Sequence, residues 1–167
     1  MKLTRVLIYL AMMGGILFIL AIIFAPSIEA LCERPSGISC LSYLFFRPIC
    51  HQDPARSFWL AGVPLPVCAR CFGIYLGAFL GLGAFGLMRG TTTRRPFPRS
   101  WLILGIAPLF ADGTFNALRL FTTPEYLRAS IGIVAGAVMA GASIPAVNQM
   151  LDMFHSRPDS RGEYAQQ

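Results

Sequence analysis

Three cysteines and one histidine lie close together in the segment "CHQDPARSFWLAGVPLPVCARC", residues 50–71. A C-x-x-C pair presents two thiolates to one tetrahedral ion, and an upstream cysteine or histidine completes the ligand shell. Cys50, His51, Cys68 and Cys71 therefore form a candidate Cys3His site for zinc or another transition metal, structural rather than catalytic because a four-ligand shell leaves no open position. The neighbours Cys50 and His51 need an unusual backbone to face one ion, so the pattern alone does not fix the site.

The same C-x-x-C pair is also a candidate redox site. A helix is expected to begin at these residues, and a helix N-terminus stabilises a thiolate. Arg70 lies between Cys68 and Cys71 and adds positive charge. Cys32 and Cys40 would then exchange disulfides with the inner pair. This plan resembles, in architecture only, the quinone-coupled membrane disulfide enzymes, including vitamin K epoxide reductases, and gives Cys50 no role.

The cysteines have a third interpretation as disulfide staples. All five precede the second apolar segment, and their odd number leaves at least one thiol unpaired or bound to something else. Cys32 and Cys40 lie in a loop at a spacing that allows a disulfide. Two disulfides and one buried thiol would hold the loop without any chemistry, and spacing alone does not choose among the three interpretations.

The composition is that of a membrane protein. Hydrophobic residues make up 55% of the chain, charged residues only 13%, and the mean hydropathy is +0.60, whereas soluble domains average about 25% charged residues. About 20 apolar residues cross a bilayer as a helix. We expect an all-α integral membrane protein of one domain, 1–155, with four transmembrane helices in a compact bundle, a Cys/His loop at 25–71 and a flexible polar tail at 156–167. The expected helices are residues 6–24, 72–88, 101–118 and 129–151.

Two shorter features qualify this topology. The stretch "ISCLSYLFF" is too short to span and predicts an interfacial or re-entrant helix within the loop. The first apolar segment has a cleavable signal peptide as its alternative, but its apolar core is longer than the usual 7–15 residues. An uncleaved anchor is therefore favoured.

Basic residues indicate the orientation, because cytoplasmic loops are enriched in Lys and Arg. With four spans, eight basic residues share one side: Lys2, Arg5, Arg89, Arg94, Arg95, Arg99, Arg157 and Arg161. The other side holds six: Arg34, Arg47, Arg56, Arg70, Arg119 and Arg128. We predict a multi-pass protein of the inner (plasma) membrane, with both termini inside and the Cys/His loop outside. The net charge of +6 does not indicate nucleic-acid binding, because no basic stripe forms.

Small residues recur at four-residue spacing in the second and fourth apolar segments: Gly73, Gly77 and Gly81, and Gly132, Gly136 and Ala140. Such faces let helix backbones approach closely in lipid. Packing of these two helices within one chain is favoured over formation of a homo-oligomer through the same face.

An acidic residue inside a spanning segment is costly and usually functional or paired. Asp112 is expected about 10 Å below the outer end of its helix, with Asn116 on the same face. Three roles compete: an ion pair with Arg70 or Arg56, an additional metal ligand, or a proton acceptor. The ion pair is favoured. Arg56 has Asp53 as an alternative partner, or an anionic group such as a lipid phosphate.

The motifs together resemble those of the membrane proteins known as domain of unknown function 2085. The resemblance rests on C-H-Q at residues 50–52, R-S-F at 56–58, Gly62, P-V-C-A-R-C at 66–71 and G-I-Y-L-G at 73–77. The later "ADGTFNALR" and "LRASIGIVAGAV" are similar to two further elements, although the glutamine usual after Gly113 is absent. The likeness covers about residues 42–145.

The resemblance implies a multi-pass membrane protein and supplies no activity. It favours a shared unit of Cys50, His51, Cys68 and Cys71 over a two-pair shuttle, because Cys32 and Cys40 fall outside the motifs. It also ties Asp112 to that unit. No catalytic residue is assigned. The leading hypothesis is a metal site, with quinone-coupled thiol–disulfide exchange as the alternative.

Overall fold

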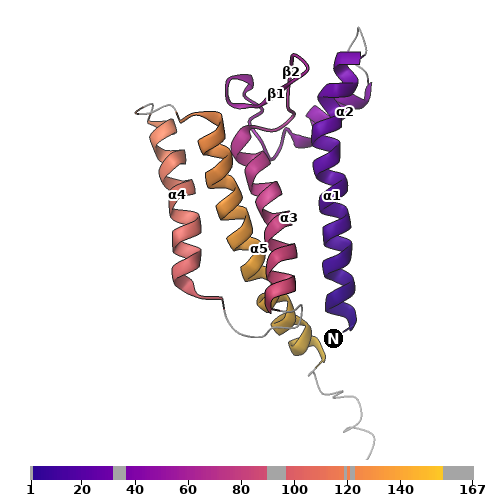
Figure 1. Cartoon of the computed structure of the whole chain (residues 1–167), viewed down its shortest axis with the longest axis vertical. Coiled ribbons are helices and arrows are strands. Elements are labelled where there is room, and N and C mark those ends of the chain that lie inside the picture. The colour runs from indigo at the N-terminus through magenta and orange to yellow at the C-terminus, as the bar shows by residue number, and fades with distance from the viewer. Residues whose placement is uncertain (1, 32–36, 90–96, 119, 121–122, 156–167) are drawn as a thin grey trace, which may run out of the picture.

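The computed structural model describes residues 2–31, 37–89, 97–118, 120 and 123–155. Four long helices run side by side, and a small cap of short elements sits over one end (Figure 1). In chain order the elements are α1 Lys2–Leu31, α2 Gly37–Phe46, a 3-10 turn Pro54–Arg56, β1 Trp59–Leu60, β2 Val63–Pro64, α3 Ala69–Arg89, α4 Arg99–Ala117 and α5 Glu125–His155.

Three of the helices are long and apolar enough to cross a membrane: α1 over Val6–Ser27, α3 over Ala69–Gly86 and α5 over Glu125–Met153. The helix α4 is not among them. It carries Asp112 and Asn116, which lower its hydropathy, and both side chains are buried. The four expected helices are all present, and each is longer than the sequence indicated. The expected tail, 156–167, lies outside the described residues.

The contact between α3 and α5 is the closest in the bundle. A Cβ added at Gly77 would lie 2.1 Å from the carbonyl oxygen of Ile133, and one at Gly136 would lie 2.1 Å from that of Ile74. Gly73 and Gly132 are equally crowded by the backbone of the opposite helix. Because only glycine allows such an approach, the predicted packing of these two helices within one chain is confirmed.

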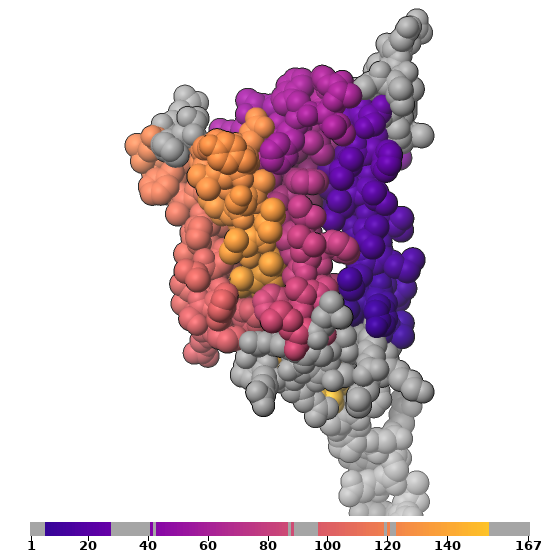
Figure 2. All heavy atoms as spheres, in the orientation of Figure 1, coloured from indigo at the N-terminus to yellow at the C-terminus, as the bar shows by residue number. Residues whose placement is uncertain are grey.

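The helix α1 stands apart from this pair. Its exposed residues include many large apolar ones, as expected for a surface that meets lipid. Between α1 and α3, Figure 2 shows an opening in the lower half of the molecule. It belongs to a groove of about 550 Å³ lined by Phe18, Tyr75 and Phe79 among others. Phe18 bridges the two helices higher up by packing edge-on against the Tyr75 ring.

The cap corrects two expectations, an all-α fold and a Cys/His loop that starts at residue 25. The helix α1 continues through Pro26 to Leu31, and α2 forms where a short interfacial helix was expected. The strands β1 and β2 pair as an antiparallel hairpin that the sequence did not predict. Its two turn residues, Ala61 and Gly62, have φ of 53° and 81°, as a type I′ turn requires.

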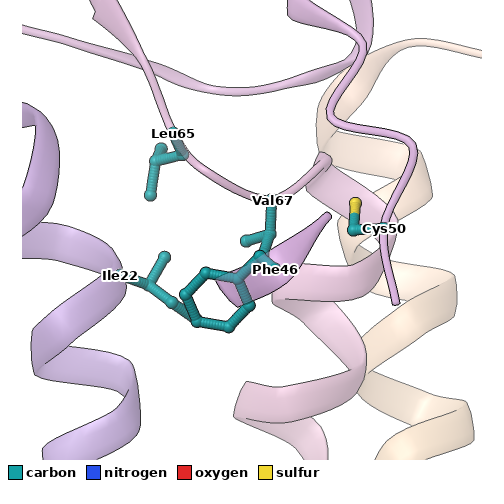
Figure 3. Close-up of a cluster of buried hydrophobic side chains, with 5 residues drawn as sticks. All are labelled: Ile22, Phe46, Cys50, Leu65 and Val67. Carbon is teal, nitrogen blue, oxygen red and sulfur yellow. The ribbon is translucent and has the colours of Figure 1, made fainter. Parts of the chain in front are cut away.

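A small hydrophobic core fastens the cap to the helices. Figure 3 shows Ile22 of α1 facing Phe46 of α2, with Leu65 and Val67 from the segment that follows the hairpin. Cys50 is the fifth buried member of this cluster. The cluster therefore fixes the position of the first cysteine and of the chain that leads into α3.

Candidate metal centre

Three of the predicted site residues come together at the cap end of α3. The Sγ atoms of Cys50, Cys68 and Cys71 all lie within 4.8 Å of one another, and none of the three forms a disulfide. Thiolates around a tetrahedral zinc ion, with Zn–S bonds of about 2.3 Å, lie about 3.8 Å apart. The observed spacing therefore reaches that geometry by small side-chain rotations, so this donor set fits a zinc-like ion.

Two segments of the chain form this cluster: the Cys-His-Gln arm, residues 50–52, and the C-x-x-C arm, residues 68–71. The Gln52 side chain donates hydrogen bonds to the carbonyl oxygens of Tyr43, at 2.7 Å, and Pro66, at 2.9 Å. It thereby ties the Cys-His-Gln arm both to α2 and to the segment preceding the C-x-x-C pair. The Cys68 backbone N–H donates to Cys50 Sγ at 3.2 Å. Gln52 adopts φ of 51°, an uncommon conformation that these side-chain bonds stabilise.

The C-x-x-C arm lies at the start of α3. Cys68 precedes the helix, and its carbonyl accepts the N–H of Phe72 at 2.9 Å. Cys71 falls in the first turn. Both sulfurs therefore lie at the positive end of the helix dipole, which favours thiolates. Hydrogen bonds from the side chains of Cys68 and Cys71 lower the pKa of the Cys50 thiol. The same contact with Cys50 raises the pKa of Cys68.

His51 is not part of the three-sulfur group. It is exposed, although it lines the same cavity as the cysteines. Its role as fourth ligand stays a prediction. Cys32 lies outside the described residues, as does the side chain of Cys40, so a disulfide between them also stays a prediction.

Asp112 forms the ion pair expected of it. It accepts a hydrogen bond from Arg70 Nη2, and its side chain is only 4% exposed, against 26% for Arg70. Asn116, one turn later, donates to Asp112 Oδ1 at 2.9 Å. The pair joins α4 to the first turn of α3, directly beside the cysteines. Arg56, the other suggested partner of Asp112, instead forms an ion pair with Asp53 at 3.1 Å on the surface.

The hydrogen bonds among Arg70, Asp112 and Asn116 form a polar network. This network includes two further residues that the sequence did not indicate. Thr123 donates to Asp112, and Arg128 of α5 donates to the side-chain oxygen of Asn116. Arg128 is only 5% exposed. It was counted as a basic residue of the outer side, yet it stands four residues before Gly132, on the row that faces α3. That i, i+4 relation to the glycines was the signal that Arg128 is buried.

The cysteines and the network share one cavity of about 500 Å³. Its lining includes Cys50, Cys68 and Cys71 together with Arg70, Asn116 and Arg128. His51, Asp53 and Arg56 also reach it. Every predicted metal ligand therefore borders a space large enough for a small ligand.

Comparison with known proteins adds a family and no activity. A family model described as "Predicted membrane protein (DUF2085)" matches residues 50–141, a range that starts at Cys50 and includes Asp112 and Arg128. An uncharacterized protein of Methanocaldococcus jannaschii is 32% identical over 146 residues, covering 85% of this chain and 93% of that protein. Another, of Methanothermobacter thermautotrophicus, is 38% identical over 96 residues, covering 57% of this chain and 84% of its own length. No solved structure matches.

Proposed function

Because the chain belongs to the family of predicted membrane proteins called DUF2085, we propose that it is a multi-pass membrane protein that holds a transition metal at its cap. The donor set is the three sulfurs of Cys50, Cys68 and Cys71, and the ion that suits it best is zinc. The single observation that carries this proposal is the approach of these sulfurs, within 4.8 Å of one another, from two separate arms.

His51 is the proposed fourth ligand. It is adjacent to Cys50 and borders the same cavity, so a change in its side-chain torsions would bring the imidazole toward the ion. A complete Cys3His shell makes the metal structural: it would clamp the cap onto α3 and leave no open position for a substrate.

The helix α4 is the proposed fourth span. Its polar residues Asp112 and Asn116 do not face lipid, because they are buried against Arg70 and Arg128. Paired in this way, polar side chains are tolerated inside a membrane. With four spans, the two termini share one side and the metal site lies on the other.

The proposed orientation places the termini in the cytoplasm. Of the six basic residues assigned to the outer side, Arg70 and Arg128 do not lie in a loop but donate hydrogen bonds to residues of α4. Removing these two leaves four basic residues outside against eight inside, which strengthens the charge asymmetry. The metal site would then lie at the outer face of the plasma membrane.

Thiol–disulfide exchange is the second candidate function. Tyr75, one turn after Cys71, lines the groove of about 550 Å³ between α1 and α3, an apolar space at membrane depth suited to a quinone. In this reaction the Cys68 and Cys71 thiols join as a disulfide and release two electrons and two protons, which reduce the quinone to its quinol. Cys32 and Cys40 would then exchange with that disulfide.

Metal content and thiol counts of the detergent-purified chain separate these functions. The metal site predicts one equivalent of zinc per chain, and thiols that react only after chelation. The double variant Cys32→Ser/Cys40→Ser is the matched control and should keep the zinc, whereas Cys50→Ser should lose it. A metal-free protein whose Cys68–Cys71 pair cycles between dithiothreitol and a soluble quinone would refute the metal site and favour exchange.

A further inference from the structure

Arg128 carries a buried charge that no acidic residue balances. It is 5% exposed, its Nε has no hydrogen-bond partner, and its side chain bonds to the neutral amide of Asn116. Within the described part of the chain, Arg70 pairs with Asp112 and Arg56 with Asp53, while Arg128 forms no ion pair. Glu125, on the same helix, is not within ion-pair distance of it. An unpaired buried charge is costly, so a partner from outside the chain is expected.

The space beside Arg128 suits an anion. Arg128 and Arg70 both border the cavity of about 500 Å³, and the Nε of Arg70 is also buried without a partner. Arg128 lies in the first turn of α5, a helix of 31 residues, whose positive dipole end adds to the field. Guanidinium groups bind phosphate oxygens through paired hydrogen bonds, which makes phosphate the best-matched anionic group.

An apolar groove continues from this cavity along α4. It has a volume of about 470 Å³ and shares Arg70, Gly113 and Ala117 with the cavity. Its other walls include Leu109, Phe110 and Leu118, of which the last two are strongly exposed. A charged cavity that opens onto an apolar groove at the end of a membrane helix matches an amphiphile, with an anionic head and a hydrocarbon tail.

We propose that this cavity binds the phosphate headgroup of an anionic membrane lipid, with Arg128 as its counter-charge and the acyl chain along α4. The proposed metal ligands line the same cavity. The inference nevertheless goes beyond the metal site, because it rests on the unpaired charge of Arg128 and on the groove along α4, neither of which includes a metal ligand. A free phosphate ion would satisfy the same guanidinium group, and the experiment below distinguishes the two sources.

The test is native mass spectrometry of the full-length, delipidated protein in detergent. Dioleoyl phosphatidylglycerol and dioleoyl phosphatidylcholine are titrated separately, and inorganic phosphate is titrated in a third series. The variants are Arg128→Gln and, as a matched control, Arg47→Gln, an exposed arginine that does not line the cavity. Gly113→Leu places a larger side chain where the cavity and groove meet and keeps both arginines. Zinc content is measured on every sample to keep the lipid and metal results separate.

We expect one phosphatidylglycerol per chain, bound about tenfold more tightly than phosphatidylcholine, because the choline cation is repelled by the arginines of the cavity whereas glycerol is neutral. Arg128→Gln and Gly113→Leu should each remove that preference, while Arg47→Gln retains it. Unchanged lipid binding in both cavity variants would overturn the proposal, and so would an equal loss in the Arg47 control. Inorganic phosphate that binds as tightly as the lipid would overturn the assignment to a lipid.

Discussion

Replacing Gly77 by alanine tests whether the close approach of α3 and α5 holds the bundle together. The added Cβ would lie 2.1 Å from the Ile133 carbonyl oxygen and 2.6 Å from the Ile133 Cα. A carbon and a carbonyl oxygen in contact stay about 3.3 Å apart, so the two helices must separate by about 1.2 Å at this crossing. Both obstructing atoms belong to the backbone, which cannot turn aside as a side chain does.

Overpacking of this kind costs about 1–3 kcal/mol, while alanine gains up to about 1 kcal/mol over glycine in helix propensity. Gly83→Ala is the matched control, since it lies in the same helix and gains the same propensity. Its nearest neighbour is the terminal methyl of Met12, at 3.3 Å, which can move. The difference between the two variants isolates the helix contact, so Gly77→Ala should be less stable than Gly83→Ala by about 1–3 kcal/mol.

The measurement is unfolding of the metal-stripped protein by increasing sodium dodecyl sulfate in mixed micelles, followed by tryptophan fluorescence. Removing the metal beforehand keeps ion binding out of the free energy. Equal stability of the Gly77→Ala and Gly83→Ala variants would refute the reasoning, because it would mean that α3 and α5 do not touch at Gly77.

Three further predictions follow from the site. Asp112→Asn should lower the free energy of unfolding by about 2 kcal/mol in the same titration, which is below the usual 3–5 kcal/mol for a broken buried pair because Arg70 is partly exposed. Arg56→Gln removes an ion pair at the surface and should lower the free energy of unfolding by under about 1 kcal/mol. Equal losses in the two variants would contradict the difference in burial. An impermeant maleimide added to intact cells after chelation should label Cys68, and labelling only after permeabilisation would reverse the proposed orientation. Zinc retention in equilibrium dialysis should fall as pH falls, because protons compete with the ion for thiolates, and pH-independent retention between about pH 5 and 8 would exclude thiolate ligands.

Much of the architecture was predictable because lipid imposes simple rules. An apolar stretch of sufficient length has to be a helix, and glycines at four-residue spacing have to face another backbone. The depth of Asp112 in its helix also predicted its partner, since an acid at that level needs a cation and Arg70 begins the neighbouring helix. These inferences depend on distances along single helices, which a sequence contains.

The cap was less predictable because its geometry depends on contacts between distant segments. The hairpin turn places Ala61, a residue with a side chain, at positive φ, and β2 includes Pro64. Alanine is not typical of a turn position with positive φ, and proline is not typical of a β-strand, so the sequence did not indicate a hairpin here. The helix α1 continues through Pro26, which membrane helices tolerate and soluble ones seldom do.

His51, the proposed fourth ligand, shows the same limit. Cys50 lies in the buried core cluster, whereas His51, the next residue, is exposed. The sequence contained both residues and the spacing to the C-x-x-C pair, but not the backbone torsions that decide whether both reach one ion. Arg128 was missed for a related reason, since its burial follows from the position of the α5 glycines rather than from its own neighbours.

X-ray absorption at the zinc edge tests the central claim most directly, because it counts the atoms bound to the ion. For the purified full-length protein, the three-sulfur cluster of Cys50, Cys68 and Cys71 predicts a shell of three sulfurs at about 2.3 Å and one nitrogen at about 2.0 Å. His51→Ala should replace the nitrogen with a light oxygen scatterer and leave the sulfur shell intact. A shell with fewer than three sulfurs, or one unchanged in Cys50→Ser, would contradict the account.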